Sequence, residues 1–268
     1  MTLNHSDIVD ALTEEWATLS QLLGSLREDQ WQLPSTLPGW RVHDIVSHLI
    51  GTESTLLGEP VPPEIEHRDH VRNPIGEFNE RWVDFLKDTS SAEMKAKFDE
   101  VTARREAALR GLTDEDWQAP TASPVGPTTY GRFMRIRVFD CWMHELDIYD
   151  ATSIPGTGAG HRSEVAFHEI FFGLGYAIGK RAKAPDGSRI AIVLTGAHPQ
   201  TINVEVSGRA RVVDALSGPP TTTVTLDSGL LIRLYGGRVN PADHLDEAVI
   251  DGDANTGRRI VENLAVTI

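Results

Sequence analysis

The segment from Arg135 to Asp150 carries residues whose types and spacing suit metal chemistry. Asp140 and His144 are four residues apart, so on a helix both side chains lie on one face, about 5–6 Å apart at their Cβ atoms. That spacing suits two ligands of one cation. His48, in the apolar segment VHDIVSHLIG, could complete a facial set from another helix. Two neutral imidazoles and one carboxylate would hold a divalent cation and leave coordination positions open, as in catalytic zinc sites.

Simpler interpretations of the same residues stay open. An Asp and a His at this spacing on a helix commonly form a solvated hydrogen bond. Asp44 lies four residues before His48 and could pair with it, or could accept a hydrogen bond from its second ring nitrogen and so orient it. Glu145 and Asp147 flank His144 and are expected to be solvated acids, although either could accept the second ring proton of that histidine.

Hydrophobic periodicity predicts the helices that would carry these residues. A first helix has apolar residues at three- and four-residue spacing, namely Leu12, Trp16, Leu19, Leu22, Leu23 and Leu26. A second helix is expected from about Val42 to Leu57 and carries His48. Further helices are expected over Ile75–Lys87, Ser91–Arg110 and Thr129–Asp150, and Ser90 with Glu93 has capping-box spacing. The first half of the chain is therefore predicted to be a helix bundle with long connections.

A weak internal repeat relates the two histidine segments. The sequence LREDQWQLP, Leu26–Pro34, shares its Leu, Trp, Gln and Pro with LTDEDWQAP, Leu112–Pro120. Each copy is followed by a loop rich in Thr, Ser, Pro and Gly and then by a predicted helix that contains His48 or His144. A duplicated helical pair would place the two histidine helices in related positions.

The second half of the chain has a different pattern. A helix is expected over His161–Ala184, and β-like runs follow at Ile190–Leu194, Ile202–Val206, Arg211–Ala215 and Thr221–Leu226. A short helix ending at Gly236 and Gly237, a strand in AVIDGD and a helix in ANTGRRIVENLAV complete it. This pattern predicts an α+β domain on a mostly antiparallel sheet. The breaker-rich segment Ser153–Gly160 predicts a linker, with domains over residues 1–155 and 161–268.

Charge and composition exclude several classes of partner. The formal net charge is −14, and residues 1–150 hold 14 basic against 27 acidic residues. Binding to nucleic acid or an anionic membrane through bulk charge is therefore not expected. No Lys or Arg precedes Arg27 and no apolar run is long enough to span a membrane, so we expect a cytoplasmic protein. The one cysteine, Cys141, is expected to be a small buried filler, which leaves His and carboxylates to hold any metal.

Four motifs together resemble the mycothiol-dependent maleylpyruvate isomerase family. They are TLPGWRVHDIVSHLIG at Thr36–Gly51, FDCWMHELDIYDA at Phe139–Ala151, LYGGR at Leu234–Arg238 and VIDGD at Val249–Asp253. The resemblance covers essentially the whole chain. It implies an α+β protein: a DinB-like four-helix bundle that binds metal, followed by a smaller domain similar to sterol-carrier modules.

The resemblance implies a zinc site and a thiol cofactor. Its zinc ligands are His48, Asp140 and His144, although the better-known isomerases have Glu where this chain has Asp140. Mycothiol, or a similar low-molecular-weight thiol, is expected at the open zinc position, where its thiolate attacks an electrophilic carbon. Addition to a conjugated cis-enedione acid such as maleylpyruvate allows isomerisation, whereas loss of a leaving group gives S-transfer. The sequence leaves both reactions open.

A substrate carboxylate would need a cation, and Arg238 is the candidate that the resemblance places beside the bundle. A guanidinium can bind a carboxylate through two hydrogen bonds. The alternative is a surface arginine at a helix C-terminus. Arg233, Arg209 and Arg211 are weaker candidates for the same task.

Two other functions compete with the thiol-dependent enzyme. One is a non-enzymatic protein that binds a small ligand, because the segment HRSEVAFHEIFFGLGYAIG is apolar enough to line a cavity. The other is a metal-dependent hydrolase that uses water at the open zinc position. In each case we expect a small-molecule partner and a monomer or a homodimer.

Overall fold

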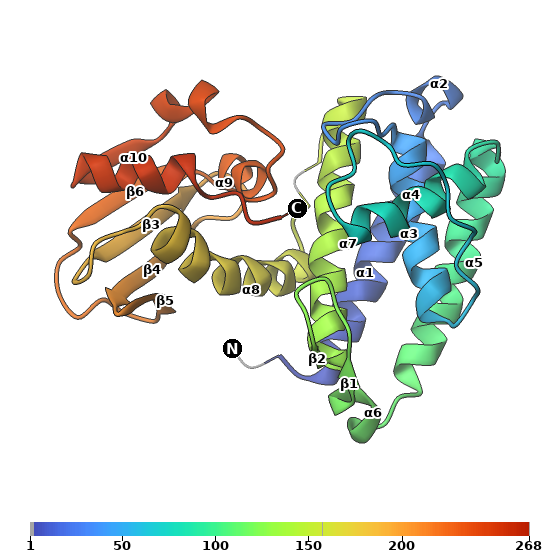
Figure 1. Cartoon of the computed structure of the whole chain (residues 1–268), viewed down its shortest axis with the longest axis horizontal. Helices are drawn as coiled ribbons and strands as arrows, with labels where there is room; N and C mark the ends of the chain where they lie inside the picture. Colours follow the sequence, from blue (N-terminus) through green and yellow to red (C-terminus); the bar gives the residue numbers. More distant parts are fainter. Residues whose placement is uncertain (1–2, 157, 268) are drawn as a thin grey trace. The chain divides into compact units, whose positions relative to one another are not determined.

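The chain forms a helical first unit and a second unit built on a β-sheet, as expected for an α+β protein (Figure 1). The computed structural model describes residues 3–156 and 158–267. The division between the two compact units falls between Ala166 and Phe167, inside helix α8, which spans His161–Tyr176. The predicted linker Ser153–Gly160 includes residue 157, which lies outside the described residues.

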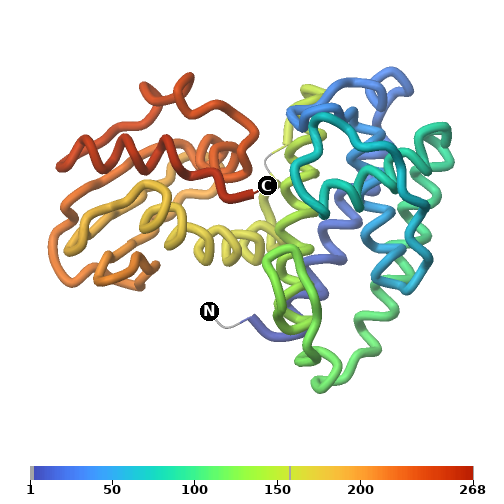
Figure 2. The backbone as a smooth tube through the Cα atoms, in the orientation of Figure 1, coloured from blue at the N-terminus to red at the C-terminus, as the bar shows by residue number. Residues whose placement is uncertain are grey.

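Four long helices form the bundle of the first unit. They are α1 (His5–Ser25), α3 (Val42–Leu56), α5 (Ser91–Arg110) and α7 (Tyr130–Thr152). Helices α1 and α3 each pack against both α5 and α7, and a shorter helix, α4 (Pro74–Leu86), packs against α3 (Figure 2). The predicted four-helix bundle is confirmed, and α3, α4, α5 and α7 begin and end within two residues of the predicted bounds.

Apolar stripes and caps explain why these segments are helical. Leu12 and Leu19 of the predicted stripe on α1 are completely buried, whereas Leu26 lies just past the helix end. The Asn4 side chain accepts a hydrogen bond from the backbone of Asp7 and so caps α1. The expected capping box of Ser90 and Glu93 is present at the start of α5.

Both copies of the internal repeat form a short helix that precedes a histidine helix. The first copy contains α2 (Glu28–Trp31) and the second contains α6 (Asp114–Gln118). In each of them the shared tryptophan, Trp31 or Trp117, is buried in the bundle core. The internal sequence repeat therefore corresponds to a repeated structural unit, a short helix with a buried tryptophan.

The two connections after these short helices also match. Pro34, the last residue of the first copy, forms an antiparallel bridge with Arg41, the N-cap of α3. Pro120, the last residue of the second copy, pairs in the same sense with Thr129, the N-cap of α7. The second pairing extends into two short strands, β1 (Pro120–Thr121) and β2 (Thr128–Thr129). Helices α3 and α7 thus start from equivalent turns.

The second unit contains a five-stranded sheet with the order β5-β4-β3-β6-β7. The strands are β3 (Arg189–Thr195), β4 (Gln200–Ser207), β5 (Arg209–Val213), β6 (Thr222–Asp227) and β7 (Val249–Gly252). Only the β3–β6 pair is parallel, so the expected antiparallel-rich sheet is present. Alternate residues of β4 and β6 are buried, as in a sheet with one face on a core.

The bounds of one strand and two helices differ from the predicted ones, and the last helix, predicted over ANTGRRIVENLAV, ends at Glu262. Strand β5 starts at Arg209 rather than Arg211, because Gly208 adopts a positive φ of 66° and turns the chain directly from β4 into β5. The helix expected to reach Ala184 ends at Tyr176 and continues as a π-helical turn, η1 (Ala177–Arg181).

The sheet is packed against two helices, α9 (Ser228–Tyr235) and α10 (Ala254–Glu262), which both contact β6. Two short 3-10 turns, η2 (Pro241–Asp243) and η3 (Leu245–Glu247), connect α9 to β7. Within the described residues, no helix is both long and apolar enough to cross a membrane.

A buried cluster of three carboxylates and one guanidinium joins the start of α8 to the bundle. Arg162 donates two hydrogen bonds to Glu145, of 3.0 and 2.9 Å, and one of 2.8 Å to Glu14. Its Nε atom also lies 2.9 Å from Glu15, which is completely buried. Burial and then the charge of Glu145 raise the pKa of Glu15 well above its ordinary value. The folded protein therefore favours the protonated form of Glu15.

Replacing Glu15 with Gln should stabilise the protein as pH rises. The pKa of Glu15 is higher in the folded than in the unfolded chain, so ionisation favours unfolding above about pH 4.3. The E15Q variant lacks this penalty. The free energy of unfolding, measured in urea, should become increasingly larger for E15Q than for the wild type as pH rises from about 4 to 7. A difference that does not grow with pH would contradict the assignment, and E14Q, at the half-buried partner of Arg162, is the control.

Candidate metal centre

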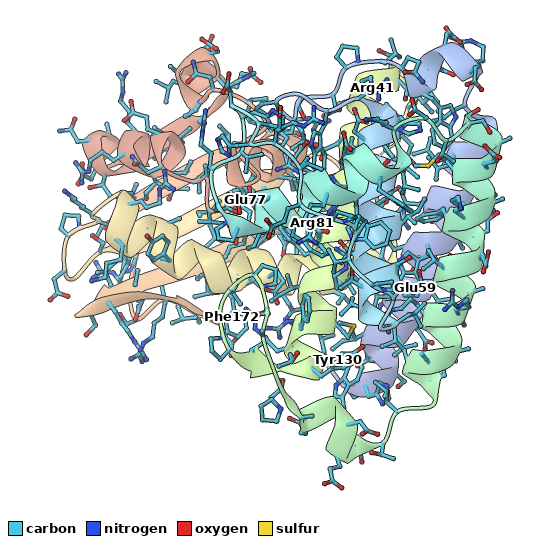
Figure 3. All side chains as sticks on the ribbon, turned by 45° about the vertical axis from the view of Figure 1, so that its right-hand side comes forward. Arg41, Glu59, Glu77, Arg81, Tyr130 and Phe172 are labelled. Atoms are coloured by element: carbon cyan, nitrogen blue, oxygen red, sulfur yellow. The ribbon has the colours of Figure 1, made fainter. Side chains whose placement is uncertain are left out.

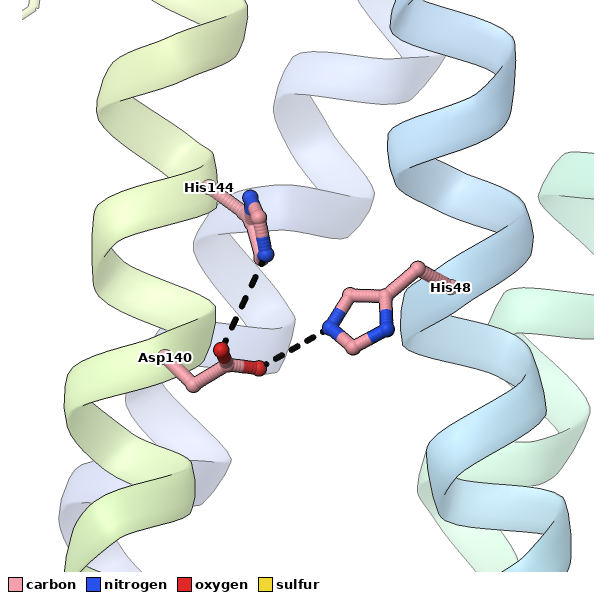
Figure 4. Close-up of side chains that lie close together, drawn as sticks. All are labelled: His48, Asp140 and His144. Atoms are coloured by element: carbon pink, nitrogen blue, oxygen red, sulfur yellow. Dashed lines mark hydrogen bonds and ion pairs between the residues drawn. The ribbon is translucent and has the colours of Figure 1, made fainter. Parts of the chain in front are cut away.

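His48 on α3 faces Asp140 and His144 on α7 inside the bundle (Figure 4). The Nε2 atom of His48 lies 3.1 Å from Oδ2 of Asp140, and Nε2 of His144 lies 3.8 Å from Oδ1 of the same carboxylate. One ligand atom from each residue lies within 4.8 Å of the other two. The structure thus brings together the three residues that the sequence singled out.

These separations come near the size of a tetrahedral zinc site. Ligand atoms at about 2.0–2.2 Å from zinc lie roughly 3.3–3.6 Å from one another. One donor atom from each of the three residues lies within 4.8 Å of the other two, a spacing that would contract by about an ångström around a bound cation. Two imidazole nitrogens with one carboxylate oxygen are also the kind of donor set that zinc accepts.

Burial argues against a solvated Asp–His pair. The side chains of His48 and His144 are each 7% exposed, whereas that of Asp140 is 35% exposed. The imidazoles are therefore enclosed, and the carboxylate is the member of the set that solvent reaches.

The protonation states also suit a cation. Burial lowers the pKa of His48, which outweighs the opposite effect of Asp140. Burial raises the pKa of Asp140, but the charge of Arg137 and the contact with His48 outweigh it and hold that pKa well below its usual range. A neutral imidazole and an ionised carboxylate are the forms that bind a metal.

His144 is oriented by a neighbouring acid. Its Nδ1 atom lies 3.0 Å from Oδ2 of Asp147, and the Thr36 hydroxyl donates to the other oxygen of that carboxylate at 3.3 Å. An Nδ1–H bound to Asp147 leaves the Nε2 lone pair for a cation. The expectation that Glu145 and Asp147 are solvated is wrong, because both are buried and Glu145 binds Arg162 instead.

Asp44 does not serve His48 in either of the ways that the sequence left open. Its carboxylate accepts hydrogen bonds from the backbone and the guanidinium of Arg41, at 2.8 and 3.0 Å, and so caps α3. It also lies 3.7 Å from His43. The other ring nitrogen of His48 is instead 3.5 Å from the Thr52 hydroxyl, a long contact.

Trp40 covers both imidazoles. Its ring centre lies 5.6 Å from that of His48 and 6.3 Å from that of His144. Its indole N–H donates a 2.6 Å hydrogen bond to buried Glu80. Gly39 before it has a φ of 80°, and a Cβ there would lie 2.7 Å from the His70 ring, so the PGW motif needs its glycine.

The sequence analysis did not single out Arg137 or Glu53, which border the site. Arg137 donates a hydrogen bond to Asp140, and the spacing of three residues on one helix was the available signal. Glu53 binds Arg137 from α3, across 84 residues of sequence, and no local pattern indicates that pair.

Arg238, the predicted substrate cation, belongs to the second unit. It is half-buried just past the end of α9, where it donates a 2.6 Å hydrogen bond to the carbonyl of Gly236. This contact is the one expected of an arginine at a helix C-terminus. A role for Arg238 toward substrate stays a prediction. Cys141 is completely buried, as expected.

Fold and site together define a helical bundle that carries a candidate site of two histidines and one carboxylate, followed by an α+β unit. A family model described as the mycothiol maleylpyruvate isomerase N-terminal domain matches residues 12–149, more than half of the chain. The chain belongs to this family. None of the curated proteins matches it.

Solved structures support the same fold over nearly the whole chain. The crystal structure of the mycothiol-dependent maleylpyruvate isomerase is 15% identical and aligns over 94% of this chain and 96% of that one, with a TM-score of 0.60. A histidine-to-alanine mutant of that isomerase aligns over the same shares, also at 15% identity, with a TM-score of 0.56. A ubiquinone-synthesis protein, UbiJ-SCP2, aligns with 37% of this chain at a TM-score of 0.29, which is too low to establish a shared fold. The similarity to sterol-carrier modules therefore stays a prediction.

Replacing Asp147 with Asn should weaken metal binding. The variant loses the carboxylate that holds Nδ1 of His144, and loss of such an outer partner commonly costs about 10–100-fold in metal affinity. Competition with a chromophoric chelator measures the zinc dissociation constant. Asp44→Asn is the matched control, because Asp44 is also buried but binds Arg41. Equal affinities for D147N and D44N would show that Asp147 does not act on His144.

Proposed function

We propose that this chain is a zinc-dependent enzyme that uses a low-molecular-weight thiol such as mycothiol to isomerise or conjugate a small electrophile. The observation that carries the proposal is the convergence of His48, Asp140 and His144 within a bundle of the mycothiol maleylpyruvate isomerase family. A small unsaturated acid similar to maleylpyruvate is the substrate class that fits this membership.

The three side chains would hold zinc with a residual positive charge of about +1, since only Asp140 contributes a negative charge. Bound zinc would lower the pKa of a coordinated thiol from about 8.5 and so supply a thiolate at neutral pH. Burial lowers the pKa of His48 and so favours its neutral form, and Asp147 contacts Nδ1 of His144, so the surroundings favour the donor forms that a metal needs.

The site is enclosed at its two imidazoles and open to solvent at its carboxylate. Reversible addition of a thiolate converts a conjugated double bond into a rotatable single bond, which is the chemistry that the thiol would supply. Trp40 lies beside both imidazoles, which are nearly buried, and solvent reaches the site at the Asp140 carboxylate. For a substrate carboxylate we retain Arg238 as the proposed partner, which would have to release the carbonyl of Gly236.

Metal and thiol binding test the proposal directly. The wild-type protein should bind about one zinc ion per chain, and His144→Ala should abolish binding and leave the bundle folded. After cobalt substitution, added thiol should produce a thiolate-to-metal absorption band, as expected of direct sulfur coordination. Metal without a thiol band would favour a hydrolase that uses water, and a protein without metal would favour a non-enzymatic binding role. Either result contradicts the proposal.

Asp140→Glu tests the carboxylate arm. The variant places glutamate at this position, as in the better-known isomerases that the chain resembles. It should therefore keep or strengthen zinc binding. The longer side chain must also keep room beside His48, which lies 3.1 Å from the Asp140 carboxylate. Zinc content per chain and circular dichroism separate loss of metal from loss of fold. Loss of zinc from folded D140E would mean that the packing of α3 and α7 is fitted to the shorter arm.

A further inference from the structure

A single guanidinium links the Asp140 carboxylate to the bundle interior. Arg137, one turn before Asp140 on α7, donates a hydrogen bond from Nη1 to Oδ2 of Asp140. Its Nε and Nη2 atoms both donate to Oε1 of Glu53, at 3.0 and 2.8 Å. Glu53 belongs to α3, the helix that also carries His48. The contact therefore connects the same two helices as the candidate metal site.

Glu53 is fixed from a third helix as well. Its Oε2 atom accepts a 2.8 Å hydrogen bond from Nε of Arg105 on α5. Arg105 in turn donates from Nη2 to the hydroxyl of Tyr130, at 3.1 Å, and lies 3.2 Å from the sulfur of Met134. Tyr130 is the first residue of α7 (Figure 3). The side chains of Glu53, Arg105 and Arg137 are 1%, 2% and 3% exposed.

This arrangement leaves the guanidinium of Arg137 little freedom. Two of its nitrogens bind one oxygen of Glu53, and Arg105 holds the other oxygen. The terminal torsion of an aspartate is broad, so a free Asp140 carboxylate would sample many orientations. The fixed hydrogen bond from Arg137 selects one of them, with Oδ2 toward His48 and Oδ1 toward His144.

Stability alone is a weak reason for such a network. Buried ion pairs cost desolvation, and apolar residues of similar volume often stabilise a core as well or better. This network ends on Asp140, the most exposed of the three candidate ligands and so the one least held by packing.

We propose that Arg137 and Glu53 are positioning residues that fix the Asp140 carboxylate in the orientation a cation requires. Arg137 acts on the ligand directly, and Glu53 acts through Arg137. The inference rests on the proposed metal site, but it concerns how the protein orders Asp140 before any metal binds.

Two variants separate orientation from charge. Arg137→Lys keeps the positive charge but lacks the fork that binds Glu53 and Asp140 together. Glu53→Gln keeps the shape but weakens the hold on Arg137. Each should raise the zinc dissociation constant at least about 10-fold and shift the visible bands of the cobalt-substituted protein. If charge alone mattered, R137K would bind zinc as the wild type does.

Glu145→Gln is the matched control. Glu145 also binds a buried arginine, Arg162, through two hydrogen bonds, and it does not contact Asp140. This variant weakens a buried arginine–carboxylate contact away from Asp140, so it should keep its zinc affinity within about twofold of the wild type. Wild-type affinity and cobalt spectra in both R137K and E53Q would overturn the proposal.

Crystal structures of the metal-free wild type and R137K give a readout that does not need the metal. We expect the Asp140 carboxylate to keep its orientation in the wild type and to turn or become disordered in R137K. If the wild type binds no zinc, the proposed function fails, and these two structures still decide the positioning role. An Asp140 oriented alike in both structures would overturn it. Should R137K not fold, the same comparison is made with E53Q.

Discussion

The packing of α3 against α7 is the contact on which the candidate site depends. It brings His48 of α3 opposite Asp140 and His144 of α7. It also buries the ion pair between Glu53 and Arg137. Buried charges of this kind are tolerated only when each has a partner. The polar residues between the two helices therefore constrain their separation and register, and with these the distances among the three donors.

Local patterns account for much of the fold. The apolar stripes, the Ser90 capping box and the breaker-rich connections predict the long helices closely, because these signals act within a few residues. The pairing of Asp140 with His144 follows from helical spacing in the same way. His48 was joined to them only through the internal repeat and the family resemblance, since its approach to α7 is a tertiary contact.

The features that the sequence did not predict are mainly choices of partner. Asp44 binds Arg41 and Glu145 binds Arg162, and of the two acids that could have served His144 it is Asp147 that contacts it. Which of them is solvated, capping or buried depends on the neighbouring helices, which a single sequence does not reveal. The early start of β5 and the π-helical end of α8 similarly depend on a tight turn and on local packing in the second unit.

Asp44 and His48 have the same spacing as Asp140 and His144, but the two sets lie at different distances from the matched turns before α3 and α7. His48 is the seventh residue after Arg41, whereas His144 is the fifteenth after Thr129, so the second pair lies about two turns deeper along its helix. Asp44 lies in the first turn of α3, where its carboxylate accepts a hydrogen bond from a free backbone N–H, that of Arg41. In the deeper position such N–H groups are already bonded within the helix. The distance of an Asp–His spacing from the helix start thus decides whether its aspartate caps the helix or is available as a metal ligand.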